Sequence, residues 1–84
     1  MKIDILVKPN ESTAQIERLI QTAAVAIKIQ VQVTKTSNFI AYSNLSINPS
    51  QTPMIIINGN LEFAGRIPDL DLLKKKMAEV LRRQ

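Results

Sequence analysis

The stretch from Thr52 to Ala64 constrains the fold most, because it predicts an antiparallel hairpin. Two apolar runs flank the dipeptide Asn58-Gly59. A two-residue type I′ turn needs positive φ at both central positions, and Asn-Gly adopts it at low cost. Pro53 stands at the start of the first run, where a missing amide is tolerated. The hairpin must therefore join whatever sheet the rest of the chain builds.

The first 34 residues predict a strand, a helix and a second strand. Lys2–Val7 alternates, and Leu6 on its second face indicates a strand covered on both sides. An apolar stripe at helical spacing predicts a helix from about 13 to 26. In Ile29–Thr34, β-branched residues alternate with Gln, which favours a strand with one wet face. Such a unit is expected to be parallel and right-handed.

The connecting segments carry turn and cap signals. The run from Lys8 to Glu11 predicts a turn, and Ser12 with Gln15 fits a capping box in which the Ser12 hydroxyl accepts from the Gln15 amide. Asp69 is a good N-cap for a last amphipathic helix.

The segment between the second strand and the hairpin is harder to assign. Ser37 is placed to cap a short helix carrying Phe39, Ile40 and Tyr42. Leu45–Gln51, rich in Ser and Asn, reads as a loop. The predicted order is therefore strand, helix, strand, helix, strand, strand, helix.

This order resembles the minimal thioredoxin/glutaredoxin arrangement. Thr52-Pro53 before a buried strand is similar to the cis-proline dipeptide of that fold, although the sequence does not show whether Pro53 is cis. Gly65-Arg66-Ile67-Pro68 before a Lys-rich helix resembles the end of the small redox-active disulfide proteins. The resemblance spans the chain. It implies one α/β domain over residues 1–84, with a four-stranded mixed sheet of order 2-1-3-4 flanked by helices.

The chain departs from that family at its redox site. The family carries Cys-x-x-Cys where this chain has Asn10-Glu11-Ser12-Thr13, so Asn10 and Thr13 stand in place of the two thiols. With no Cys and no His in 84 residues, dithiol chemistry, Cys/His zinc sites, haem or iron–sulfur ligation by Cys, and Ser-His-Asp triads are excluded. We therefore expect a redox-inactive protein that is not an enzyme, with no catalytic residue, metal or cofactor.

Two interpretations of this region stay open. Asn10, Glu11, Ser12 and Thr13 are most simply a loop and a helix cap. Alternatively, the helix N-terminus and Thr52-Pro53 form a groove for an extended peptide or a glutathione-like ligand. Family enzymes often keep a buried acid beneath the thiols, but here we expect Asp4 to be exposed near a strand end, because Asp is seldom buried unpaired.

The second predicted strand is an edge, with Gln30, Gln32 and Thr34 as candidate pairing residues. Only two charged residues, Lys28 and Lys35 at its ends, protect this edge from pairing with another strand. It is either a plain edge or a pairing surface for a homodimer or partner strand.

The net charge of +4 resides after Leu72, where five basic residues accompany Glu79. Lys74, Lys75 and Lys76 fan around the helix, and no aromatic residues interleave to stack bases. Nucleic-acid binding is therefore the weaker hypothesis, and a solvated helix face is favoured.

A membrane or secreted location is not expected. The longest apolar run, Ala23–Ile27, is too short to span a membrane, and Met1–Asp4 reads as the start of a strand and not as a leader peptide. The expected protein is a cytoplasmic, thioredoxin-like interaction module for a protein or peptide. Glutathione or small-ligand binding is the first alternative, and weak nucleic-acid contact through the last helix is the second.

Overall fold

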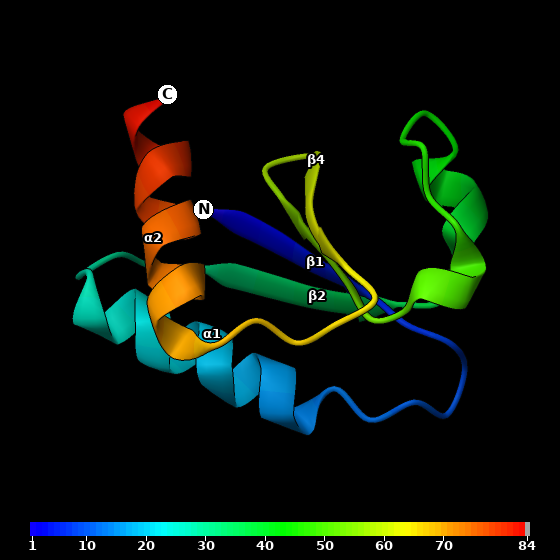
Figure 1. The fold of residues 1–84 in the computed structure, drawn as a ribbon, viewed down its shortest axis with the longest axis horizontal. Coiled ribbons are helices and arrows are strands. Elements are labelled where there is room, and N and C mark those ends of the chain that lie inside the picture. Colours follow the sequence, from blue (N-terminus) through cyan, green and yellow to red (C-terminus); the bar gives the residue numbers. More distant parts are fainter. Residues whose placement is uncertain (84) are drawn as a thin grey trace.

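The computed structural model describes residues 1–83, in which two α-helices cover one face of a four-stranded sheet (Figure 1). The strands are β1 (Lys2–Leu6), β2 (Gln32–Thr36), β3 (Met54–Ile57) and β4 (Asn60–Ala64). The helices are α1 (Ala14–Ala26) and α2 (Leu70–Arg82). Two short 3-10 helices, η1 (Phe39–Tyr42) and η2 (Pro49–Gln51), lie between β2 and β3.

The strand order is β2-β1-β3-β4, which confirms the predicted sheet. β1 and β2 run parallel, and β3 is antiparallel to both β1 and β4. Leu6 at the end of β1 lies opposite Thr36 of β2 and Met54 of β3. The loops that leave β1 and β2 therefore share one edge of the sheet with the chain that enters β3.

The hairpin prediction is confirmed by the backbone of Asn58 (φ 49°) and Gly59 (φ 86°). Both adopt the positive φ that a type I′ turn requires. The Asn58 amide donates to the Lys2 carbonyl at 2.8 Å, and the Lys2 amide donates to Asn58 Oδ1 at 2.9 Å. The turn is thus tied to the start of β1, which fixes the register of the hairpin on the sheet.

The predicted first helix is confirmed, but the strand after it begins later than the sequence indicates. The chain leaves α1 through Lys28 (φ 60°), and the Ile29 amide donates to the Ala24 carbonyl at 3.0 Å. Residues 29–31 then carry the chain back to the sheet. The Gln32 amide donates to the Met1 carbonyl at 2.9 Å, directly at the start of β2.

The expected helix after Ser37 is wrong: residues 1–83 contain two α-helices, not three. The chain makes one 3-10 turn at η1, and the side chain of Asn38 at its start forms no cap hydrogen bond. In a 3-10 helix, residues three apart lie one above the other. Phe39 and Tyr42 therefore both reach the sheet from a single turn.

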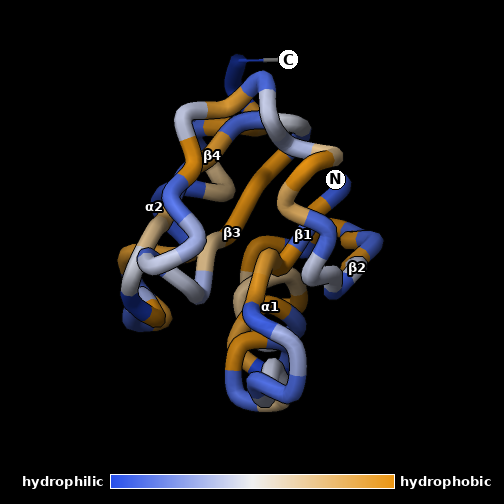
Figure 2. Tube along the Cα trace, turned by 90° about the vertical axis from the view of Figure 1, so that its right-hand side faces the viewer, coloured by the Kyte–Doolittle hydropathy of each residue, from blue (hydrophilic) through white to orange (hydrophobic). Residues whose placement is uncertain are grey.

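The sheet is buried on both faces by different means. Thirteen buried residues form the main core between the sheet and the helices. They come from β1, α1, β3, β4 and α2, and from Val7 directly after β1. On the second face only Leu6, Met54 and Ile56 form a buried cluster, against which side chains of the segment Ser37–Gln51 pack. We call this segment the cover segment. Figure 2 shows the continuous hydrophobic run of β3, one of the two central strands between these layers.

Candidate functional site

The predicted groove residues leave from the same edge of the sheet. The Val7 amide donates to the Thr36 carbonyl at 3.0 Å, which extends the β1–β2 pairing to the last residue before the loop. Because Leu6 lies opposite Met54, Thr52 and Pro53 enter the sheet where residues 8–13 leave it. The structure thus gathers both predicted halves of the groove at one sheet edge.

The loop before α1 is closed by its own acidic residue. The Lys8 amide donates to Glu11 Oε1 at 3.0 Å, and the Glu11 amide donates to the Lys8 carbonyl at 3.1 Å. Asn10, at the tip, has a φ of 70° and is exposed. Glu11 is therefore a loop-forming residue, and Asn10 is one of the exposed side chains of this turn, with Lys8 and Pro9.

The hydroxyls of Ser12 and Thr13, at the start of α1, form hydrogen bonds within the chain. Thr13 is 4 % exposed, and its Oγ1 donates to Glu17 Oε2 at 2.8 Å. Ser12 Oγ accepts from the Ala14 amide at 3.4 Å. The predicted Ser12–Gln15 capping box is wrong, because Thr13 occupies the cap position and turns inward. The helix end therefore offers a ligand fewer free hydroxyls than the sequence indicated.

Thr52 presents an extended backbone at the entrance to β3. Its φ and ψ are −79° and 150°, and the peptide bond to Pro53 is cis. The Pro53 carbonyl accepts from the Gly65 amide at 3.0 Å. Within residues 1–83, neither the amide nor the carbonyl of Thr52 forms a hydrogen bond. Thr52 is thus an extended, partly exposed residue with both backbone groups unpaired.

The second predicted surface lies apart from this groove. Gln32 and Thr34 are in β2, whose outer edge is unpaired in the sheet, whereas Gln30 precedes the strand. The Gln30 carbonyl accepts from the N-terminal amine at 3.1 Å. Gln30 and Gln32 flank the start of β1, at the opposite end from Thr52, and Thr34 lies opposite Asp4 in the middle of the strand. Lys35 lies inside β2 and not at its end. Its charge therefore protects this edge from strand pairing better than the sequence indicated.

Asp4 is buried (5 % exposed), so the expectation that it is exposed was wrong. It lies on the sheet face of Leu6, opposite Thr34 and Ile56, beneath the cover segment. Burial raises the pKa of the Tyr42 hydroxyl, and the neighbouring Asp4 carboxylate raises it further, through its charge and as a hydrogen-bond acceptor. The alternation of Lys2–Val7, with Leu6 buried, was the signal that placed Asp4 on a covered face.

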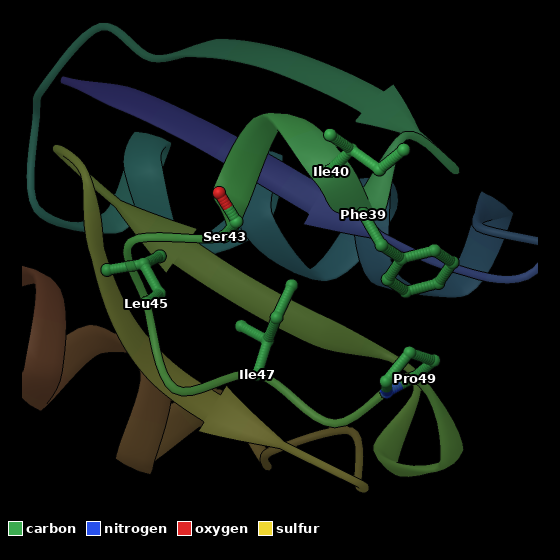
Figure 3. A pocket seen from close by; sticks show the side chains of 6 residues that line it. All are labelled: Phe39, Ile40, Ser43, Leu45, Ile47 and Pro49. Carbon is green, nitrogen blue, oxygen red and sulfur yellow. The ribbon is translucent and has the colours of Figure 1, made fainter.

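The cover segment carries a pocket that sequence reasoning missed. It has a volume of about 350 Å³ and is lined by Phe39, Ile40, Ser43, Leu45, Ile47 and Pro49 (Figure 3). Ile40 is 84 % exposed. The lining is almost wholly apolar, and only Ser43 brings a hydroxyl. No local sequence pattern marks such a pocket, because its walls come from both sides of the loop.

Most basic side chains of α2 and its C-terminal end lie close to carboxylates of the same chain. A register shift in the β3–β4 pairing leaves Glu62 opposite no residue, and its carboxylate approaches Lys76 Nζ at 3.8 Å and Arg83 at 3.3 Å. Lys74 pairs with Asp71 at 3.6 Å. Three of the five basic residues thus face carboxylates, which leaves a weaker positive patch than the sequence indicated.

Residues 1–83 contain no group of three or more His, Cys, Asp or Glu side chains able to hold a metal ion. No helix in this part of the chain is long and apolar enough to cross a membrane.

A family model described as "Thioredoxin domain" matches residues 1–78. The match confirms the resemblance inferred from the element order and from Thr52-Pro53. No curated protein and no solved structure matched the chain in the corresponding searches.

Proposed function

This chain belongs to the thioredoxin-domain family, and we propose that it is a redox-inactive member that binds an extended protein or peptide segment along Thr52. It has no cysteine, so dithiol exchange has no residue to carry it. We therefore assign no enzymatic activity, cofactor or metal. Because no disulfide supports the fold, we propose the cytoplasm as its location.

The unpaired backbone of Thr52 carries this proposal. An extended residue with a free N–H and a free C=O can pair with a partner backbone as one step of a β-ladder. Pro53 cannot donate, and its carbonyl is engaged with Gly65, so the partner must pair at Thr52. Main-chain pairing at one residue gives modest affinity, so neighbouring side chains must set specificity.

We propose that the exposed tip of the first loop, at the same edge of the sheet, supplies part of that specificity. Asn10 is exposed, whereas Glu11 and Thr13 are held by internal hydrogen bonds. The side-chain amide of Asn10 can both donate and accept a hydrogen bond, so it suits the N–H and C=O groups of an extended segment. Ser12 and Pro53 complete the groove as contact surface.

Glutathione binding is the weaker alternative. An anionic ligand at the N-terminus of α1 would meet the positive end of the helix dipole. Glu17 already lies in the first turn, and the Thr13 hydroxyl donates to it. Nucleic-acid contact through α2 is weaker still, because Lys74, Lys76 and Arg83 face carboxylates.

The test begins with peptides selected by this protein from a random phage-displayed library. Titration of the ¹⁵N-labelled protein with a selected peptide should shift the amide resonances of Asn10, Thr52 and Met54. Glutathione is titrated separately. Shifts confined to other elements, or shifts at residues 10–14 with glutathione alone, would contradict peptide binding at Thr52.

A backbone variant isolates the pairing itself. The chain is short enough for chemical synthesis, and replacing the Thr52 amide by an ester exchanges the N–H for an oxygen and so removes this donor. Peptide affinity should fall about tenfold, as expected when one hydrogen bond is lost. Thr52→Val is the control, because it keeps the amide and loses only the hydroxyl. An insulin-reduction assay should show no turnover; real turnover would overturn the redox-inactive assignment.

A further inference from the structure

We propose that the cover segment is a dimerisation surface on which two copies of this chain meet, each inserting Ile40 into the pocket of the other. Ile40 is the most exposed large apolar side chain of residues 1–83. Its side chain is one of the six that line the 350 Å³ pocket (Figure 3). The side chain that would be inserted therefore lies next to the cavity that would receive Ile40 of a second copy. An exposed apolar side chain next to an open apolar pocket is a self-complementary pair.

The walls of the pocket are fixed by the fold. Phe39, Leu45 and Ile47 pack with part of their surfaces against the buried cluster of the second sheet face. Their remaining surfaces line the pocket. Ile40 takes no part in that cluster, so the core does not account for its apolar side chain. A receiving site that is already formed lowers the cost of binding.

Charge makes the cover segment the favoured surface for contact between two copies of this chain. No charged residue occurs between Lys35 and Glu62, although the chain carries a net charge of +4. Two copies that met through α2 would bring like charges together. Contact through the cover segment avoids this repulsion and presents one uncharged apolar surface to another.

Ile40 and the pocket lie on one patch, as a two-fold axis requires, and a dimer of standard size would need most of the cover segment. In a symmetric dimer the same patch serves both copies, so one insertion of Ile40 implies the other. A standard interface buries about 800 Å² per partner, roughly a sixth of the 5170 Å² exposed here. The cover segment holds 15 of the 84 residues, so most of it must take part.

The test is the oligomeric state as a function of protein concentration. Sedimentation of the wild type from micromolar to millimolar should show a monomer passing into a dimer. Ile40→Asp should raise the dissociation constant by about 100-fold, because the symmetry removes two buried isoleucines at once. Val25→Asp is the matched control: Val25 is also β-branched and 76 % exposed, but lies on α1. It should dimerise like the wild type.

Several outcomes would overturn the proposal. One is a wild type that stays monomeric at millimolar concentration; another is an Ile40→Asp variant that dimerises as tightly as the wild type. Dilution shifts in the ¹⁵N spectrum should fall within residues 37–51, and shifts at Gln32 and Thr34 alone would place the contact at the β2 edge. Ile40→Ser, with circular dichroism of each variant, separates loss of contact from loss of fold. The dimer does not use the Thr52 backbone, so it is tested separately from peptide binding.

Discussion

The carboxylate of Asp4 in β1 lies beside the hydroxyl of Tyr42 in η1 and helps to raise its pKa. The two residues join the central strand to the cover segment across the second sheet face. Tyr42 is the only tyrosine, and the chain has no tryptophan. Its ionisation can therefore be followed alone by ultraviolet absorbance.

Asp4→Asn should move the Tyr42 titration toward lower pH. The substitution removes the charge of Asp4, whereas burial, the larger cause of the raised pKa, persists. The midpoint should therefore fall but stay above the ordinary value of about 10. Spectrophotometric titration in native buffer and in urea provides the measurement and its reference. An unchanged midpoint would mean that Asp4 does not act on the hydroxyl.

The same pKa shift predicts a stability that decreases at alkaline pH. Because the pKa of Tyr42 is higher in the folded chain than in the unfolded chain, folding favours the protonated phenol. This contribution is fully present below about pH 10 and is lost as pH rises through the folded pKa. Urea midpoints should fall above pH 10 in the wild type and fall less in Tyr42→Phe. Equal slopes in the two proteins would contradict this source of the pH dependence.

Local signals predicted part of this fold well. Asn58-Gly59 and Asp69 decide their own turn and cap, and the structure confirms both: Asp69 Oδ1 accepts from the Leu72 amide at 2.8 Å. Local signals could not predict whether Phe39–Tyr42 forms an α-helix or a 3-10 turn. Tertiary contact decides it, because one 3-10 turn suffices to place Phe39 and Tyr42 on the sheet.

In the candidate site, too, the sequence predicted the location, whereas tertiary contacts decide the state of individual side chains. Its location at Asn10–Thr13 and Thr52-Pro53 followed from the resemblance to the thioredoxin/glutaredoxin arrangement, and the structure brings these segments to one sheet edge. The inward turn of Thr13 depends on its contact with Glu17, and the burial of Asp4 depends on the cover segment. The alternation of Lys2–Val7 indicated a covered face for Asp4, but no local pattern named Tyr42 as its neighbour.

Thr13→Val should lower the free energy of unfolding by about 1 kcal/mol. The valine keeps the shape of a buried, β-branched side chain but removes the hydroxyl that donates to Glu17 at 2.8 Å. Ser12→Ala is the control, because Ser12 is exposed and its hydrogen bond to Ala14 is long at 3.4 Å. Chemical denaturation compares the two. A larger loss in Ser12→Ala would mean that the Ser12 hydroxyl, and not the Thr13–Glu17 hydrogen bond, stabilises the start of the helix.

Glu62→Gln should destabilise the protein by about 1 kcal/mol at low salt and by less at high salt. The Glu62 side chain is 10 % exposed and faces Lys76 and Arg83, so its charge ties β4 to α2. Glu79→Gln is the matched control: Glu79 also pairs with Lys76, at 3.3 Å, but is more exposed and on the same helix. Its loss should be smaller. A salt-independent effect of Glu62→Gln would argue against an electrostatic origin.

Replacing neighbouring isoleucines of β3 should separate the two faces of the sheet. Ile55 and Ile56 are both fully buried, but Ile55 belongs to the main core and Ile56 to the three-residue cluster under the cover segment. Either change to alanine should cost about 2–5 kcal/mol. Only Ile56→Ala should also speed hydrogen exchange at the Ser43 and Leu45 amides, which are bonded within the cover segment, more than exchange in β1. The same exchange pattern in both variants would mean that the cover segment opens only when the whole chain unfolds.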